Sequence, residues 1–268
     1  MVALPLADLL ALVGRLDDAP GDDTPRERYR RFLRERVTEL SLLRRYISEC
    51  AGKSDQQHMR ALRDLVLHLG RLLEFEVEFG PYQLLPGRIA HSGRWWSPSG
   101  LHVVLELKAS ETYTAQRPSL VHAIEELISA GQISGWPDVV GLYVVGQPDV
   151  QLSHLEKTIL AERQAHAIRI VSINSLLRLA QATRRRALTH QQLHTILRAG
   201  APTLDGLAEL VYRLTGRGFG PWDCALEIGD AIDSLLDWLA GILSAAGGPP
   251  DRSESRTPRS ADGHGPDR

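Results

Sequence analysis

The sequence predicts an α/β domain with a mixed central sheet flanked by helices, and with helical additions before and after it. Three observations favour this fold class. Apolar residues recur at helical spacing toward both ends of the chain, and from residue 74 their spacing changes to strand alternation. An almost unbroken apolar segment at 139–145 is typical of a strand covered on both faces. We expect N-terminal helices at 1–53, an α/β core at 54–183, C-terminal helices at 184–246 and a disordered tail at 247–268.

The N-terminal region begins with an amphipathic helix at 6–16, followed by turn-forming residues at 17–23. Thr24 and Pro25 form a helix-start signature, and the apolar spacing predicts one helix that continues to about Cys50. This helix is rich in arginine. The arginines form a solvated helix face, or they form a binding surface. Such a surface would contact phosphates, a second copy of the chain or a defence-system partner.

The core is expected to begin with a helix from residue 54 or 55 to about Leu73, which packs on the sheet. Segment 74–79 alternates strictly, so its apolar side chains share one face and its glutamates form the wet face of an edge strand. Further strands are predicted at 87–96, 102–108, 139–145 and 168–173, and helices at 119–130 and about 150–165. The first three strands predict a meander, and the last two predict a parallel pair with a right-handed crossover.

Beyond the core the sequence predicts helices at 175–183, 189–197, 204–214 and 225–243. The segment from residue 247 onward has almost no apolar residues. Burial there cannot offset the conformational entropy that ordering costs, so this tail is expected to be disordered.

Composition and charge exclude several classes of protein. The formal net charge is -2, so any nucleic-acid binding must come from local basic patches. Cys50 and Cys224 have no metal or redox spacing, which favours a reducing, cytoplasmic compartment. Asp8 and Arg15 interrupt the apolar start of the chain before it reaches a membrane-spanning length. The absence of a glycine-rich phosphate loop and a nucleophile elbow disfavours nucleotide hydrolysis and serine-hydrolase chemistry.

The predicted strand at 102–108 carries two charged residues among valines and leucines. Side chains alternate along a strand, so Glu106 and Lys108 share a face and are neighbours. Burying them is costly unless they pair, bind an ion or line a cleft. One interpretation is metal-dependent phosphodiester cleavage, with the carboxylate on a divalent cation and the lysine orienting water or offsetting developing charge. The other is a salt bridge at the end of a sheet.

The order of elements around this pair resembles the PD-(D/E)xK nuclease superfamily over about Gln56 to Leu179. In that superfamily the Glu-x-Lys motif lies on the third strand of a restriction-endonuclease-like core, and the segment at 97–113 looks like its Mrr-like branch. The resemblance implies an endonuclease that acts on DNA in defence or repair and depends on Mg²⁺ or Mn²⁺. It implies that Glu106 is a metal ligand and that Lys108 is the catalytic lysine.

The sequence departs from the superfamily on the preceding strand. An aspartate is expected before a glycine there, and this chain has Ser92 before Gly93. A hydroxyl lacks the full negative charge that a carboxylate brings to magnesium. Candidate replacements are His91 as ligand or base, Glu76 or Glu78 as second carboxylate, and an acid of the preceding helix such as Asp64. The alternative is a catalytically degenerate nuclease fold that serves in nucleic-acid binding or protein assembly.

Weaker candidates lie elsewhere in the chain. Arg94, beside two tryptophans that either stack on bases or pack at the end of the sheet, is a candidate DNA contact. The run Arg184, Arg185 and Arg186 either contacts phosphates or complements a helix dipole. A pair of histidines one helical turn apart, His190 and His194, is either a zinc-binding pair without the usual glutamate or part of a helix surface.

Overall fold

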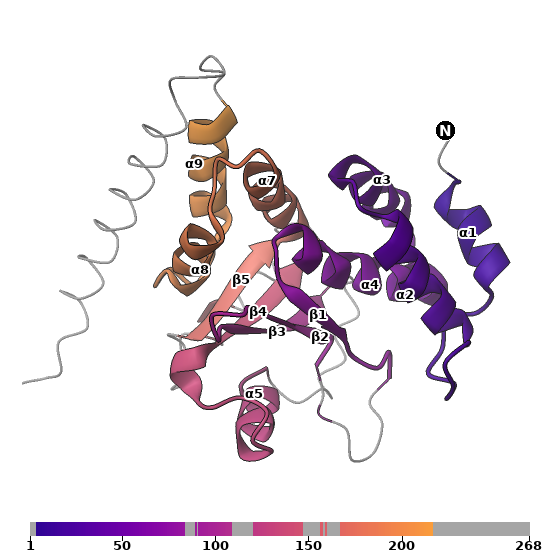
Figure 1. Ribbon diagram of the computed structural model, residues 1–268, viewed down its shortest axis with the longest axis horizontal. Helices are drawn as coiled ribbons and strands as arrows, with labels where there is room; N and C mark the ends of the chain where they lie inside the picture. The colour runs from indigo at the N-terminus through magenta and orange to yellow at the C-terminus, as the bar shows by residue number, and fades with distance from the viewer. Residues whose placement is uncertain are drawn as a thin grey trace, which may run out of the picture.

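The computed structural model describes residues 4–83, 89, 91–108, 120–146, 156–157, 159 and 167–216. Its centre is a five-stranded sheet with strands in the order β1-β2-β3-β4-β5 (Figure 1). The strands are β1 (Glu76–Phe79), β2 (Gly93–Trp96), β3 (His102–Lys108), β4 (Val139–Val145) and β5 (Ile168–Ser172). The helices are α1 (Leu6–Val13), α2 (Pro25–Arg36), α3 (Leu40–Cys50), α4 (Gln56–Leu72), α5 (Leu120–Ser129), α7 (Ile173–Arg184), α8 (His190–Arg198) and α9 (Asp205–Gly216), with a 3-10 turn η1 (Trp136–Asp138).

The sheet is mixed, as predicted. β1, β2 and β3 form an antiparallel meander, and β3, β4 and β5 run parallel to one another. The apolar strand β4 lies between β3 and β5 and every residue in it is buried, which confirms its prediction as an interior strand. β1 is an edge strand whose two glutamates are exposed while Val77 is buried, so its alternation is also confirmed.

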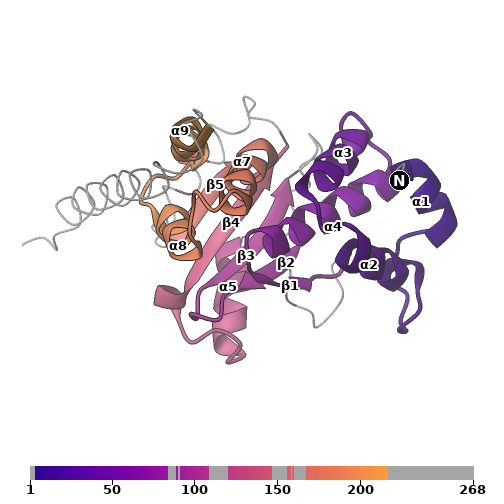
Figure 2. The ribbon, with the colours of Figure 1, turned by 45° about the horizontal axis from the view of Figure 1, so that its top comes forward.

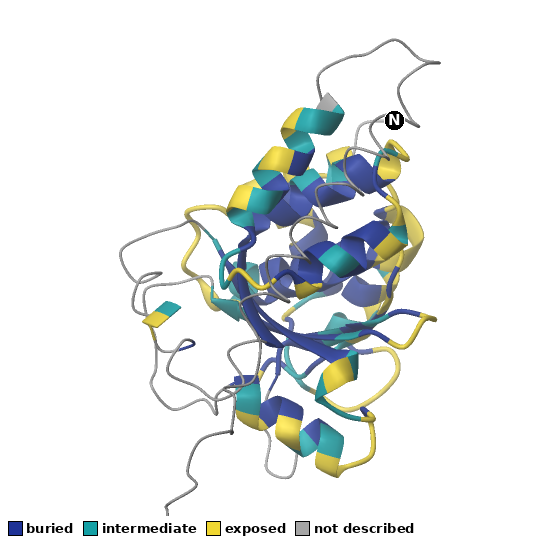
Figure 3. Ribbon diagram, turned by 90° about the vertical axis from the view of Figure 1, so that its left-hand side faces the viewer, coloured by how far each residue is buried: buried dark blue, intermediate teal, exposed yellow. Residues whose placement is uncertain are grey.

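Helices cover the two faces of the sheet unequally. In Figures 1 and 3, α5 lies against one face, and the other helices gather on the opposite side. Val103 and Leu105 of β3 belong to the large apolar cluster on the side of α4 and α7. Val104 belongs to the smaller cluster that includes Leu120 and Ile124 of α5. Odd-numbered side chains of β3 therefore face α4 and α7, and even-numbered side chains face α5.

The N-terminal and C-terminal helices share one core with the sheet. The large apolar cluster extends from Leu6 in α1 through α4 and β3 to Val211 in α9. Figure 2 shows α1, α2 and α3 grouped beside α4 at one side of the molecule. Burial of one continuous cluster stabilises these additions against the core.

The prediction of one helix from Pro25 to Cys50 is wrong. The chain forms two helices, α2 and α3, separated by residues 37–39. Val37 is fully buried with a non-helical backbone, and its carbonyl oxygen accepts a hydrogen bond from His68 Nε2 of α4 at 2.8 Å. A tertiary contact therefore stabilises a break that the helical spacing does not indicate.

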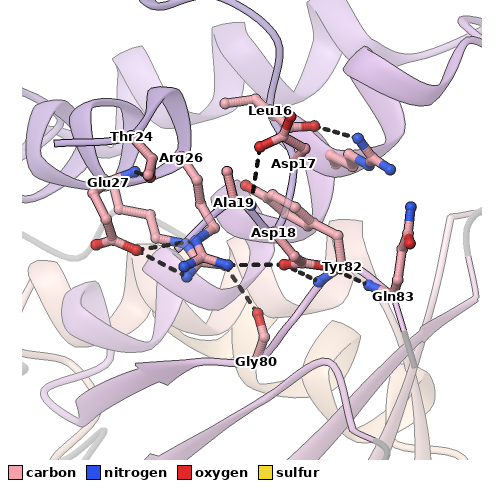
Figure 4. Close-up of polar contacts among 12 residues, drawn as sticks. Leu16, Asp17, Asp18, Ala19, Thr24, Arg26, Glu27, Gly80, Tyr82 and Gln83 are labelled. Atoms are coloured by element: carbon pink, nitrogen blue, oxygen red, sulfur yellow. Dashed lines mark hydrogen bonds and ion pairs between the residues drawn. The ribbon is translucent and has the colours of Figure 1, made fainter. Parts of the chain in front are cut away.

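The segment between α1 and α2 is fastened to the turn after β1. The Asp18 carboxylate accepts hydrogen bonds from the backbone N–H groups of Tyr82 at 2.9 Å and Gln83 at 2.8 Å, and it pairs with Arg26 at 2.8 Å (Figure 4). Burial acts to raise the pKa of Asp18, but the two backbone bonds and Arg26 outweigh it and hold this pKa below its usual value. The N-terminal region thereby holds the chain that leads toward β2.

The segments predicted as helices at 119–130, 175–183, 189–197 and 204–214 overlap α5, α7, α8 and α9, with bounds that differ by at most two residues. The strand predicted at 87–96 is shorter than expected, because β2 begins only at Gly93. The predicted helix at 225–243 and the tail at 247–268 lie outside the described residues, as does most of the helix predicted at 150–165. In the described ranges no helix combines the length and the apolar character that crossing a bilayer requires.

Candidate functional site

The candidate site is centred on the carboxyl end of β3. Glu106 and Lys108 lie on the α5 side of the sheet, and Lys108 Nζ is 4.0 Å from Glu106 Oε1. Glu106 is only 7% exposed, whereas Lys108 is half-buried. The strand alternation expected from the sequence therefore holds, and it places a carboxylate and an ammonium side by side at the rim of the sheet.

Ser92 lies beside Glu106, directly before the neighbouring strand β2. Its hydroxyl donates a hydrogen bond to Glu106 Oε2 at 3.1 Å and accepts one from the N–H of Leu107 at 3.0 Å. Its own N–H donates to the carbonyl of Leu105 at 2.8 Å. Ser92 therefore occupies the position at which the resemblance predicts an aspartate, and it fastens the Glu106 carboxylate to the backbone of β3.

Lys108 also lies over an aromatic ring of β4. Its Nζ is 5.3 Å from the centre of the Tyr143 ring, a distance at which a cation is attracted to the π face. The Tyr143 hydroxyl accepts a hydrogen bond from the N–H of Leu120, the first residue of α5, at 3.1 Å. The lysine is thus oriented by a side chain that connects β4 to α5.

His91 is a buried imidazole next to Ser92. It is 9% exposed, and its Nδ1 has no hydrogen-bond partner among the residues that the structure describes. Burial lowers the pKa of His91, and Arg63 and Arg94 lower it further, while Glu78 acts in the opposite direction. The ring is therefore neutral near pH 7, the form in which a histidine can accept a proton or bind a metal.

Arg63 of α4 holds the backbone of this segment. Its guanidinium donates to the carbonyls of His91 at 2.9 Å, Ser92 at 3.3 Å and Tyr82 at 3.3 Å. Sequence reasoning missed this residue, because an arginine in a helix is usually solvated and nothing local indicates which loop the helix crosses. The only signal is that charged residues interrupt the apolar pattern of α4 at positions where the helix is buried.

Glu78, predicted as a second metal ligand, pairs with Arg94. Arg94 Nη2 lies 2.6 Å from Glu78 Oε2, and the same guanidinium stands 5.7 Å from the centre of the Trp96 ring. Trp95 is fully buried and donates to the carbonyl of Leu67 at 2.8 Å, so at least this tryptophan packs in the core. Within the part of the chain that the structure describes, no three His, Cys, Asp or Glu side chains gather as a metal site would require.

A cleft of about 830 Å³ opens beside this arrangement. It lies between the end of β1, residues 89 and 91, and α5, and its lining includes Glu78, His91, Glu125 and Glu126. Three carboxylates at one cleft repel a phosphate backbone unless cations accompany it. Any nucleic acid at this face therefore needs bound cations.

Asp64, one of the candidate replacements for the missing aspartate, is not part of the site. Its side chain is 0% exposed and pairs with Arg30 Nε at 2.9 Å. The Tyr82 hydroxyl donates to the same carboxylate at 2.6 Å. This acid neutralises a buried arginine beneath the N-terminal helices and is unsuited to replace the missing aspartate.

The arginine run after α7 lies at the other end of the sheet. Lys108 of β3 pairs with Val145 of β4, and Val145 pairs with Ser172 of β5, so these three residues lie at the same end of the sheet. Helix α7 starts directly after Ser172. The chain then runs back to the start of α8, where His190 contacts Ser97 at the far end of β2. Arg184 pairs with Glu39 at 2.8 Å, and Arg185 and Arg186 are exposed. The structure therefore does not bring these arginines together with Glu106.

His190 and His194 form a connected cluster. His194 is buried, its Nε2 lies 3.0 Å from His190 Nε2, and both rings pack against Phe75. Burial, together with His190 and Arg198, lowers the pKa of His194 to about 4. The interpretation of this pair as ordinary helix surface is wrong.

Comparison with known proteins adds no assignment. No protein-family model and no curated protein sequence matches this chain. The functional interpretation therefore rests on the geometry at β2 and β3.

Proposed function

We propose that the chain is a metal-dependent endonuclease-like protein that acts on DNA phosphodiester bonds. The observation that carries this proposal is the pair Glu106 and Lys108 at the carboxyl end of β3. The order α4, antiparallel meander, α5 and parallel β4 supports it, because this order is the one that the resemblance to PD-(D/E)xK nucleases implies. A cytoplasmic defence or repair setting belongs to the same proposal, by analogy of fold alone.

The donor set fits a hard divalent cation that binds together with its substrate. Magnesium commonly takes one or two carboxylates, keeps several waters and completes its shell with substrate phosphates. Glu106 offers a carboxylate and Ser92 a hydroxyl. When bound, Mg²⁺ or Mn²⁺ would supply Lewis-acid polarisation of the phosphate.

The protein's own residues have separate roles in this proposal. Glu106 binds the cation, and Lys108, oriented over Tyr143, places its ammonium where negative charge develops on the phosphate. His91 accepts a proton from the attacking water, since burial keeps its ring neutral. Arg63 holds the carbonyls of His91 and Ser92 and thereby fixes both side chains relative to β3.

A second candidate function is a DNA-binding or assembly module that keeps this fold without cleaving DNA. The hydrogen bonds of Ser92 to Glu106 and to the Leu107 N–H favour it, because they use the hydroxyl to hold the strand pair together. In this alternative the exposed arginines at 184–186 bind phosphates. The exposed arginines of α2 would then bind a second copy or a defence-system partner.

Cleavage of supercoiled plasmid DNA in Mg²⁺ or Mn²⁺ tests the first proposal. We expect nicking by the wild type, and a loss of about 100-fold or more in Glu106→Gln and Lys108→Met, because each removes charge stabilisation from the reacting phosphate. Glu35→Gln and Lys53→Met are matched controls, since both residues are exposed and lie outside the proposed catalytic set and the cleft. Equal nicking by the wild type and all four variants would attribute the activity to a contaminant.

Ser92→Asp separates the two candidates. If the wild type is inert and this variant nicks DNA, the fold has lost cleavage through one substitution and the second candidate holds. Salt-dependent DNA binding that survives Glu106→Gln but weakens when the arginines at 184–186 become glutamine supports the same conclusion.

A further inference from the structure

The cluster formed by His190, His194, Ser97 and Ser99 joins α8 to the turn between β2 and β3. His190 Nε2 lies 2.9 Å from Ser97 Oγ and 3.0 Å from His194 Nε2. Ser97 and His194 are buried, His190 is half-buried and Ser99 is exposed, so one side of the cluster reaches solvent. None of these residues contributes to the site at Glu106.

A backbone carbonyl fixes which ring nitrogen of His190 carries the hydrogen in the neutral form. Its Nδ1 lies 3.0 Å from the carbonyl oxygen of Leu73, and a carbonyl can only accept. Nδ1 therefore carries the hydrogen, and in the neutral ring Nε2 presents a lone pair. This lone pair points into the space that His190 shares with Ser97 and His194.

His194 can take either neutral tautomer. Its Nδ1 lies 3.4 Å from the hydroxyl of Ser99, which can donate or accept by rotating. With the hydrogen on Nε2, His194 donates to His190 Nε2. With the hydrogen on Nδ1, both Nε2 atoms present lone pairs 3.0 Å apart, and Ser97 Oγ lies 2.9 Å from the Nε2 of His190.

This second arrangement has the features of a metal-binding histidine pair. In such pairs the ring nitrogen away from the metal usually donates to a carbonyl or another oxygen, which orients the ring. Leu73 and Ser99 provide these two acceptors. Two imidazole nitrogens at 2.0 to 2.1 Å from one tetrahedral zinc lie roughly 3.3 Å apart, close to the 3.0 Å between the two Nε2 atoms.

We propose that His190 and His194 bind a zinc-type divalent ion through their Nε2 atoms, with the Ser97 hydroxyl and water as the remaining ligands. On binding, the ion takes both lone pairs and the His194 hydrogen moves from Nε2 to Nδ1, so no net proton is released. The ion connects α8 to the turn after β2, and its role is structural. The proposal does not depend on the function assigned to Glu106.

Calorimetric titration of Zn²⁺ into the full chain, after removal of metals with a chelator, tests this site. We expect saturable binding by the wild type, and its loss in His190→Ala and in His194→Gln. His122→Gln is the control, because it removes an exposed histidine that lies outside the cluster. This variant should bind zinc as the wild type does. Absence of saturable binding by the wild type, or unchanged binding in His194→Gln, overturns the proposal.

Ser99→Ala keeps both ligands and tests the tautomer argument. Loss of the acceptor for His194 Nδ1–H should weaken zinc binding by about 10-fold or more, as such outer contacts commonly do. Thermal unfolding provides a second measurement that does not assume identical folding of the variants. Zinc should raise the unfolding midpoint of the wild type and leave that of His194→Gln unchanged. An equal rise in both proteins would place the zinc elsewhere and contradict the proposal.

Discussion

Asp64 and Glu106 are both buried carboxylates, and their surroundings differ in kind. Asp64 is held by two nitrogens of Arg30, at 2.9 and 3.3 Å, and by the Tyr82 hydroxyl at 2.6 Å. Glu106 accepts a hydrogen bond from Ser92 at 3.1 Å and has the ammonium of Lys108 at 4.0 Å. The first carboxylate is enclosed between α2, α4 and the turn after β1, and the second lies at the end of a strand beside a half-buried lysine.

The difference separates a structural acid from a candidate functional one. A bidentate guanidinium with a further phenol donor is the geometry that offsets the desolvation of a buried charge. The contacts described for Glu106 are longer, at 3.1 Å to Ser92 Oγ and 4.0 Å to Lys108 Nζ, and contacts of this kind offset less of that cost. Functional sites commonly contain such locally destabilising arrangements, and the stability of the rest of the fold compensates for them.

Removing the charge of Asp64 is expected to have the largest effect on stability. Asp64→Asn leaves the buried Arg30 without its ionised partner, and breaking a buried ion pair from one side costs about 3–5 kcal/mol. Chemical denaturation measures this change. Asp23→Asn is the matched control, because Asp23 is largely exposed and its ion-pair distance to Arg31 is 3.7 Å. The control should change stability by less than about 0.5 kcal/mol, and equal losses in both variants would contradict the structural role of Asp64.

A smaller effect is expected for Glu106. Glu106→Gln keeps the shape of the side chain and can still accept from Ser92, while it removes a charge whose burial is costly. We expect the free energy of unfolding to change by less than about 1 kcal/mol in either direction. The same denaturation experiment measures it, beside the loss of cleavage expected for this variant. A loss as large as that of Asp64→Asn would mean that Glu106 serves the fold and would weaken its assignment as a ligand.

Much of the sheet could be predicted because its signals are local. The alternation at 74–79 and the apolar run at 139–145 each depend on where side chains point within one strand. The break at residues 37–39 could not be predicted, since it depends on His68, which is distant in sequence. The merging of the N-terminal helices with the main core is likewise a matter of which apolar faces meet in space.

The candidate site was predictable only in part, for the same reason. Alternation predicts that Glu106 and Lys108 share a face, and the resemblance places Ser92 on the preceding strand. The role of Arg63 depends on where α4 crosses the segment at 91–92. The separation of Arg184 from Glu106 depends on the direction in which α7 returns along the sheet, which a basic run in the sequence does not encode.

The smallest effect is expected in the pH dependence of stability at His91. Burial lowers the pKa of this ring in the folded chain, while in the unfolded chain it returns to about 6.5. As pH falls through that value only the unfolded state gains the proton, so the stability present above about pH 6.5 decreases toward lower pH. One such group contributes at most about 1.4 kcal/mol per pH unit. Denaturation at a series of pH values should give a shallower decrease for His91→Gln than for the wild type.

The free energy of unfolding changes with pH at one slope in the wild type and at another in His91→Gln. The difference between these two slopes is the contribution of His91. The other histidines with a lowered pKa, His68, His102 and His194, are present in both proteins and contribute equally. Equal slopes would mean that His91 is protonated as readily in the folded chain as in the unfolded one. Burial would then not hold the ring neutral at mildly acidic pH, which would contradict the environment described for His91 and leave the assignment of Glu106 and Lys108 unchanged.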